Sequence, residues 1–115
     1  MRIRDERLGW ARAALMEQRR TALRYFGGKL RVMRKADRSP VTVADRLIEE
    51  RLRRELARAF PGDVIVGEEF GRPANPGSTY WTVDPIDGTR AFSRGLPSWG
   101  MLIGFVERGR PVMGA

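Results

Sequence analysis

Two short apolar segments of the chain each lead directly into acidic residues. Residues 64–66 are followed by Glu68 and Glu69, and residues 80–83 are followed by Asp84 and Asp87. Both segments have the length and composition of short buried strands. A carboxylate at the end of such a strand is costly to bury unpaired, and a metal ion or a basic partner offsets that cost. We therefore expect a cation or a basic side chain beside these carboxylates.

The residue types that are missing restrict the chemistry further. The 115 residues include no cysteine and no histidine. Their absence excludes disulfide scaffolds, cysteine zinc sites, thiol catalysis and every mechanism that needs an imidazole. Several carboxylates without histidine or cysteine suit Mg²⁺, Mn²⁺ or Ca²⁺ better than zinc.

The spacing of Asp84 and Asp87 favours a shared cation. The two residues are three positions apart, with Pro85 and Ile86 between them. This spacing lets both side chains turn toward one point while the Ile86 carbonyl faces the same way. Two simpler interpretations stay open: the Asp-x-x-Asp-Gly pattern often forms only a turn, and the glutamates after residue 66 can form a solvated strand end.

The residues after Asp87 favour an anion next to that cation. Gly88 and Thr89 are predicted to begin a short helix that runs through Phe92. The backbone N–H groups at the start of a helix can bind a phosphate. Metal ligands that lead directly into an anion-binding turn are what metal-assisted phosphate-ester chemistry requires.

Two helices are predicted in the first half of the chain. Apolar residues recur at three- and four-residue steps over residues 5–26, and Gly27-Gly28 is a stop signal. A second helix begins at Thr42, whose spacing to Asp45 resembles a capping box, and ends near residue 59 before Pro61-Gly62.

The rest of the chain predicts short strands joined by loops. Residues 36–40 and 72–79 are expected to be loops, and residues 107–110 a turn. The expected strands are residues 29–35, 64–66, 80–83, 99–106 and a hairpin partner that begins at residues 111–113.

The basic character of the chain has two interpretations. Lys and Arg number 22 against 14 Asp and Glu, a formal charge of +8. Such a balance indicates a polyanion partner or an anionic substrate, or it reflects arginine-rich helices that face water. The arginines share their helices with glutamates, and no nucleic-acid-binding motif is present. We therefore expect no nucleic-acid partner.

The sequence also indicates a protein without a membrane partner. The apolar run over residues 98–106 is far too short to span a bilayer. The charged residues 1–7 are followed by no apolar leader. We expect a cytoplasmic protein.

Three segments, taken in order, resemble the inositol monophosphatase family of Mg²⁺-dependent, lithium-sensitive phosphatases. They are Lys-Ala-Asp-Arg-Ser-Pro-Val-Thr-Val-Ala-Asp at residues 35–45, Gly-Glu-Glu at 67–69, and the family signature Asp-Pro-Ile-Asp-Gly-Thr at 84–89. The resemblance covers essentially the whole chain. It implies an α+β fold, the N-terminal αβ portion of the layered αβαβα sugar-phosphatase architecture, with two helices packed on an antiparallel sheet.

The resemblance implies metal ligands residue by residue. Glu68, Asp84 and the Ile86 carbonyl correspond to ligands of a first metal ion, and Asp84 and Asp87 correspond to ligands of a second. Members of the family use two or three Mg²⁺ ions, and Li⁺ is the expected inhibitor.

It also implies roles in catalysis and substrate binding. Glu68 and Thr89 would orient and deprotonate a metal-bound water, and Asp45 would hold the Thr89 hydroxyl. The phosphate would lie against the signature residues Ile86, Asp87, Gly88 and Thr89. Two residues, Lys35 and Asp37, correspond to a loop that moves and closes near the metals in the family.

The residues after the signature resemble one branch of the family. Arg90-Ala91-Phe92, together with the Gly-x-Pro-x-x-Gly-x-Leu-Ile run at residues 95–103, is similar to histidinol-phosphate phosphatases. L-Histidinol phosphate, an intermediate of histidine biosynthesis, is therefore the expected substrate. Inositol 1-phosphate and a sugar or adenosine bisphosphate are the alternatives.

Family members are roughly twice as long as this chain. We therefore expect residues 1–115 to be the N-terminal metal-binding half, without the further Asp ligand of the second metal and most of the alcohol pocket. Alone, this half is expected to be weakly active or inactive. The alternatives are a non-catalytic fragment that assembles with a partner chain and a basic nucleic-acid-binding module. A homodimer is left open, because the family often dimerises.

Overall fold

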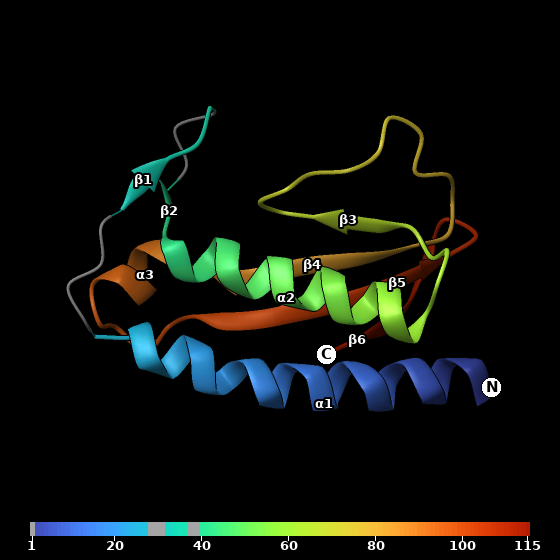
Figure 1. Cartoon of the computed structure of the whole chain (residues 1–115), viewed down its shortest axis with the longest axis horizontal. Coiled ribbons are helices and arrows are strands. Elements are labelled where there is room, and N and C mark those ends of the chain that lie inside the picture. Colours follow the sequence, from blue (N-terminus) through green and yellow to red (C-terminus); the bar gives the residue numbers. More distant parts are fainter. Residues whose placement is uncertain (1, 28–31, 37–39) are drawn as a thin grey trace.

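Two long helices cover one face of a four-stranded sheet (Figure 1). The computed structural model describes residues 2–27, 32–36 and 40–115. In chain order the elements are α1 (Arg2–Tyr25), β1 (Met33–Arg34), β2 (Pro40–Val41), α2 (Val43–Ala59), β3 (Ile65–Gly67), β4 (Tyr80–Asp87), α3 (Thr89–Ser93), β5 (Gly100–Glu107) and β6 (Arg110–Gly114). This arrangement confirms the predicted α+β class.

The sheet is mixed rather than antiparallel throughout. Its strand order is β3-β4-β5-β6; β4, β5 and β6 pair antiparallel as expected, whereas β3 pairs parallel with β4. Residues 68–79 return the chain to the start of β4, so both strands run in the same direction. The carboxyl ends of parallel strands meet at one edge of a sheet. Because Gly67 lies opposite Val83, the next residues, Glu68 and Asp84, come side by side.

Strand β4 is longer than predicted. It runs to Asp87 instead of ending at Val83, so Asp84 and Asp87 lie within the strand and do not follow it. The pairing of β4 with β5 shifts register between Asp84 and Asp87. Pro85 lies inside this irregularity, and a bulge is a position where a strand accommodates a residue without an N–H group.

The core lies between the helices and the sheet. Along β4 and β5, the buried residues Trp81, Val83, Ile103 and Phe105 alternate with less buried neighbours. On the opposite face Leu102 is 48% exposed. Within the described residues no helix covers that face of the sheet (Figure 1). This alternation places Asp84 on the face turned away from α1 and α2.

Helix α2 contributes both apolar and acidic groups to the interior. Its apolar stripe is fully buried and consists of Ala44, Ile48, Leu52 and Leu56. Asp45 and Glu49 lie beside that stripe, and both are 0% exposed. The predicted N-cap is confirmed, because Thr42 and Asp45 form a capping box. Two carboxylates one helical turn apart are therefore buried on the side of α2 that faces the sheet.

The remaining elements follow the predicted order with shifted ends. The hairpin turn between β5 and β6 contains Arg108 and Gly109, at φ 51° and 77°. Two left-handed residues in succession are typical of a two-residue hairpin turn.

The predicted strand over 29–35 is present as β1, and Pro40, expected in a loop, belongs to β2. Residues 29–31 and 37–39, including Asp37, lie outside the described residues.

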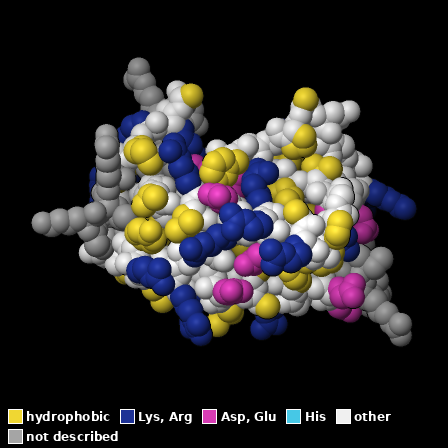
Figure 2. Space-filling view, in the orientation of Figure 1, with side chains coloured by type: hydrophobic (Ala, Val, Ile, Leu, Met, Phe, Trp, Pro, Cys, Tyr) yellow, Lys and Arg dark blue, Asp and Glu magenta, His cyan; other side chains and the backbone are white. Residues whose placement is uncertain are grey.

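The surface over α2 carries charges of both signs (Figure 2). A groove between α1 and α2 contains acidic as well as basic side chains: Glu17, Arg20, Arg24, Arg51, Arg54, Glu55 and Arg58. Arg54 also pairs with Glu50 at 3.3 Å. Among the described helices, none combines the length and apolar character needed to cross a membrane.

Candidate active site

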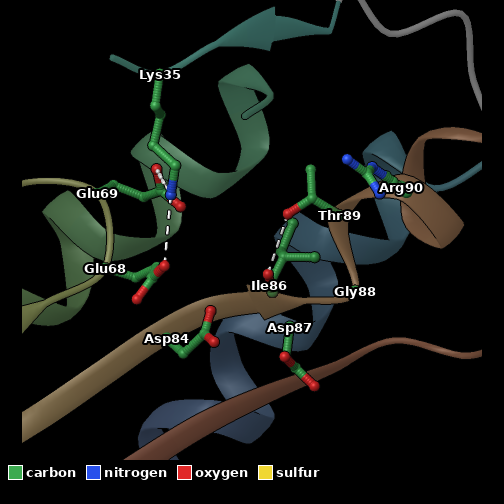
Figure 3. Close-up of a pocket in the computed structure, with 9 residues that line it drawn as sticks. All are labelled: Lys35, Glu68, Glu69, Asp84, Ile86, Asp87, Gly88, Thr89 and Arg90. Atoms are coloured by element: carbon green, nitrogen blue, oxygen red, sulfur yellow. Dashed lines mark hydrogen bonds and ion pairs between the residues drawn. The ribbon is translucent and has the colours of Figure 1, made fainter. Parts of the chain in front are cut away.

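A cavity of about 270 Å³ lies where β3, β4 and α3 meet (Figure 3). Its lining gathers most of the predicted site residues, namely Lys35, Glu68, Asp84, Ile86, Asp87, Gly88 and Thr89. Glu69 and Arg90, which were not predicted as site residues, line it as well. Asp45 does not line the cavity but is buried behind Thr89. The structure thus brings together residues that are up to 55 positions apart (from Lys35 to Arg90).

Glu68 and Asp84 come together because of the parallel strand pair. The Glu68 N–H donates to the Val83 carbonyl at 3.0 Å, which continues the ladder one residue past the end of β3. In Figure 3 the carboxylates of Glu68 and Asp84 lie next to each other. The carboxylate of Asp87, an exposed residue, extends away from both. Burial raises the pKa of Asp84 to about 6, and repulsion from Glu68, Asp87 and Asp45 adds to the rise. The Asp84 Oδ1 atom is buried and accepts no hydrogen bond from the described residues.

Lys35 supplies the basic partner expected for these carboxylates. Its Nζ lies 3.5 Å from Glu68 Oε1 and 3.4 Å from Glu69 Oε2. Burial lowers the pKa of Lys35, but attraction to Glu69 and Glu68 outweighs it and the pKa is raised. Burial likewise raises the pKa of Glu69, to about 7, although Lys35 opposes that rise.

Asp45 connects the start of α2 to Thr89. Its Oδ2 accepts from the Thr42 backbone N–H at 2.7 Å and from the Thr42 hydroxyl at 2.6 Å. Its Oδ1 accepts from the Thr89 hydroxyl at 2.8 Å, the contact expected from the family resemblance. The Ile86 carbonyl lies 3.2 Å from the same hydroxyl. A hydroxyl has one proton to donate. When Thr89 donates it to Asp45, the lone pairs of Thr89 Oγ1 can accept a hydrogen bond from another group.

Gly88 is required by the backbone at the turn into α3. Its φ is 86°, in the left-handed region that favours glycine. A Cβ at this position would also lie 2.7 Å from the Ser98 carbonyl oxygen. The predicted short helix after Gly88 is present as α3, and its first turn borders the cavity.

The oxygen atoms of this cavity fit a hard divalent cation. Glu68 and Asp84 offer two carboxylates, and Ile86 offers a carbonyl on the same lining. The buried Asp84 Oδ1, without a donor from the described residues, is free to ligate. An all-oxygen donor set is the one that Mg²⁺ and Mn²⁺ prefer. Within the described residues, no three acidic side chains converge closely enough to hold an ion by themselves.

A sequence model of the inositol monophosphatase family matches residues 4–115. The chain belongs to the inositol monophosphatase family. A histidinol-phosphatase from Mycobacterium tuberculosis is 46% identical over 94 residues, which are 82% of this chain and 36% of that protein. An inositol-1-monophosphatase from Mycobacterium bovis is 46% identical over 81 residues, which are 66% of this chain and 28% of that protein.

Solved structures of the family share the fold. The structure of the Thermotoga maritima IMPase matches with a TM-score of 0.86 at 30% identity, over 95% of this chain and 42% of that one. The chain thus spans about a third of the length of the curated relatives described above. Since two relatives of different specificity are equally identical to it, identity alone leaves the substrate open.

Sequence reasoning missed Glu49, which the structure places directly behind the family's Gly-Glu-Glu motif. Its carboxylate accepts from the N–H groups of Glu69 and Phe70 at 2.7 and 2.8 Å. The signal was available, because Glu49 lies four residues after Asp45, next to the apolar stripe of α2. An acidic residue beside a buried stripe indicates a buried partner.

The raised pKa values predict that the metal-free chain loses stability as the pH rises. Asp84 and Glu69 have pKa values of about 6 and about 7 when folded, above their ordinary values of 3.8 and 4.5. Between about pH 4 and about pH 7 these two groups therefore bind more protons in the folded chain than in the unfolded chain. Their contribution to the free energy of unfolding falls as the pH rises through this range. Lys35, with its pKa raised from 10.5, stays protonated throughout.

Urea unfolding in EDTA at about pH 5 and about pH 7.5 measures this effect. Asp84→Asn, which mimics the protonated acid, is expected to reduce the fall, whereas the exposed control Glu50→Gln should keep the native dependence. An Asp84→Asn chain with the native pH dependence would contradict the raised pKa.

Proposed function

We propose that residues 1–115 form the metal-binding half of a Mg²⁺-dependent phosphomonoesterase. The observation that carries the proposal is the buried Asp84 Oδ1, to which none of the described residues donates, beside Glu68 and Ile86 in a chain of a phosphatase family. Glu68 directly follows β3, and Asp84 directly follows the part of β4 that pairs with β3, so both lie where the two parallel strands stop pairing at one edge of the sheet. This edge of an α/β sheet is where ligands commonly bind.

Glu68, Asp84 and the Ile86 carbonyl would hold a first Mg²⁺, and Asp84 with Asp87 would contribute to a second. When bound, such ions stabilise the negative charge of a reacting phosphate and lower the pKa of water. Li⁺ is the inhibitor expected from the family. The proposed requirement for Mg²⁺ follows from the oxygen-only donor set.

The side chains around Thr89 would orient and activate a water molecule. Thr89 donates its hydroxyl proton to Asp45, which leaves its lone pairs to accept a hydrogen bond from that water. Glu68 would accept the other proton as the water oxygen bonds to phosphorus. The bond from phosphorus to the alcohol oxygen of the substrate would break in the same displacement, and the departing oxygen would take a proton from solvent. The N–H groups of Gly88 and Thr89 would donate to the phosphate oxygens, as is common where a turn leads into a helix.

Lys35 and Asp37 would belong to the mobile loop that closes near the metals in the family. Lys35 already contacts Glu68 and Glu69 at the cavity edge. An ammonium group here balances part of the acidic charge, so a phosphate that enters the cavity meets less repulsion. Asp37 lies outside the described residues.

The substrate we propose is L-histidinol phosphate, which would place the protein in histidine biosynthesis in the cytoplasm. The Mycobacterium tuberculosis histidinol-phosphatase and the Arg90-Ala91-Phe92 stretch support this choice. Inositol 1-phosphate is the second candidate, supported by the equally identical Mycobacterium bovis inositol-1-monophosphatase. The family resemblance implies that the other half of such proteins forms most of the pocket for the alcohol part of the substrate. We therefore expect this chain alone to be weakly active or inactive.

A chimera tests the proposal directly. Residues 1–115 would replace the matching segment of the Mycobacterium tuberculosis histidinol-phosphatase. We expect Mg²⁺-dependent phosphate release from histidinol phosphate, the substrate named for the relative that supplies the rest of the chimera. In that chimera Thr89→Ala should lower kcat by about 100-fold or more, a typical loss for a group that assists proton transfer.

The exposed loop variant Ser78→Ala is the control for that loss and should keep native kcat. A folded chimera that releases no phosphate from histidinol phosphate would overturn the proposed function. Turnover by the 115-residue chain alone, at the rate of the relative, would instead show that this half is sufficient.

A further inference from the structure

We propose that Glu49 is a positioning residue that holds the loop of residues 67–71 so that Glu68 faces Asp84. The inference rests on the proposed function, because it takes Glu68 to be a metal ligand. Glu49 lies on α2 beneath this loop and is 0% exposed. It touches neither the cavity nor any group expected to react, so its effect would pass through the loop backbone.

All of the Glu49 carboxylate is engaged by donors. Oε1 accepts from the Glu69 N–H at 2.7 Å, and Oε2 accepts from the Phe70 N–H at 2.8 Å and from Arg53 Nε at 2.9 Å. Such charge-assisted bonds are short and strong when the acceptor is ionised. Two successive backbone amides of the loop are therefore fixed to a single side chain of α2.

The rest of the loop is tied at its two ends. Gly67 and Gly71 exchange two backbone hydrogen bonds, at 2.9 and 3.1 Å, which close the loop on itself. Arg53 Nη2 donates to the Gly71 carbonyl at 2.6 Å, so the ion-pair partner of Glu49 holds the same loop. With the Glu68 N–H bonded to β4, the backbone of residues 67–71 is anchored at every position.

Gly67 shows how closely the carboxylate approaches the loop. A Cβ built on Gly67 would overlap Glu49 Oε2 and would lie 2.7 Å from Arg53 Nη2. Any side chain at position 67 would therefore have to displace the Glu49–Arg53 pair. The pair fills the space beside the residue that precedes the proposed metal ligand.

Stability alone does not account for this arrangement. Burying an ion pair costs desolvation that its attraction often only balances, so such a pair adds little net stability over apolar residues. What the pair adds is geometry, because it fixes the direction of two amide groups. Outer partners of this kind orient metal ligands in other proteins, and their loss commonly weakens metal binding 10- to 100-fold.

Two variants on adjacent residues of α2 test the inference. Glu49→Gln keeps the shape of the side chain but removes its charge and places an NH₂ group against N–H donors. Glu50→Gln removes the same charge from an exposed side chain that pairs only weakly with Arg54, at 3.3 Å. The first readout is amide hydrogen exchange at Glu69 and Phe70 in the metal-free chain, and the second is Mn²⁺ affinity from electron paramagnetic resonance.

Glu49→Gln is expected to lose protection at Glu69 and Phe70 and to raise the Mn²⁺ dissociation constant about 10- to 100-fold. Glu50→Gln should change neither. Cooperative thermal unfolding of both variants separates this effect from loss of the fold. Native protection, or native Mn²⁺ affinity, in a folded Glu49→Gln chain would overturn the inference.

Gly67→Ala decides the matter if Glu49→Gln does not fold. This substitution keeps both charges but displaces the flexible ends of Glu49 and Arg53. We therefore again expect a loss of amide protection at Glu69 and Phe70 and a higher Mn²⁺ dissociation constant. A folded Gly67→Ala chain with unchanged exchange and Mn²⁺ affinity would overturn the inference. If the native chain binds no Mn²⁺, the metal step of the proposed function fails, and hydrogen exchange alone then decides whether Glu49 holds the loop.

Discussion

Replacing Asp84 with asparagine is expected to abolish Mn²⁺ binding while the chain stays folded. Asp84 would serve both proposed metal ions, and a neutral amide supplies neither the charge nor the second carboxylate oxygen. Loss of an outer partner already costs 10- to 100-fold in affinity, so we expect the dissociation constant to rise by about 100-fold or more. Without metal, the variant should be more stable than the native chain at neutral pH, because the ionised Asp84 carboxylate is partly buried and is also repelled by Glu68 and Asp87.

Titration with Mn²⁺ and thermal unfolding in EDTA measure both effects. Asp5→Asn is the matched control, since it removes the same charge from an exposed position on α1. Asp5→Asn should bind Mn²⁺ as the native chain does. An Asp84→Asn variant with native affinity would remove Asp84 from the metal site.

Replacing Trp81 with alanine is expected to lower the free energy of unfolding by about 3–5 kcal/mol. Trp81 is fully buried, and its ring lies within 5.6 Å of three aromatic partners, Trp10, Phe60 and Phe105. Its indole N–H donates to Asp63 at 2.9 Å. The variant would leave a cavity where α1, α2 and β4 meet. Since domains of this size are stable by about 5–15 kcal/mol, much of the chain would then be unfolded on moderate warming.

Trp81→Phe separates packing from the hydrogen bond. It keeps a ring in the core but removes the donor, and Asp63 still has its ion pair with Arg7 at 2.9 Å. We expect a loss of about 1–2 kcal/mol from the missing hydrogen bond and the smaller ring. Urea unfolding of the two variants and the native chain gives these differences. A Trp81→Ala chain within about 1 kcal/mol of native would contradict the central place of Trp81 in the core.

The helices were predictable because their signals are local. The stripe of Leu52 and Leu56 follows the period of a helix, and the cap formed by Thr42 and Asp45 lies within four residues of sequence. The hairpin turn at Gly109 was predictable for the same reason. Such features need no knowledge of what packs against them.

The sheet was less predictable because its pairing depends on distant residues. The parallel pairing of β3 with β4 depends on how residues 68–79 cross between the two strands, which no local pattern specifies. The extension of β4 through Pro85 depends on a register shift against β5. Both features matter to the site, because the first brings Glu68 next to Asp84 and the second holds Asp87 within the strand.

Within the candidate site, the proposed ligands and catalytic residues were easier to predict than the residues that hold their loops in place. The family signature indicated Asp84, Asp87 and Thr89 directly, since their order and spacing are visible in the chain. The partners that hold the loops are spread over α2 and emerge only when the helix is placed on the sheet. Glu49 is the main example, because its contacts are with amides 20 and 21 residues further along the chain.

The most direct test of the proposed metal site is the position of a bound ion. Crystals of the 115-residue chain grown with MnCl₂ would be measured for anomalous scattering from manganese. We predict a peak within ligating distance of the Glu68 and Asp84 carboxylates and the Ile86 carbonyl. Crystals that hold Mn²⁺ only elsewhere, or that show no peak here at saturating Mn²⁺, would contradict the account.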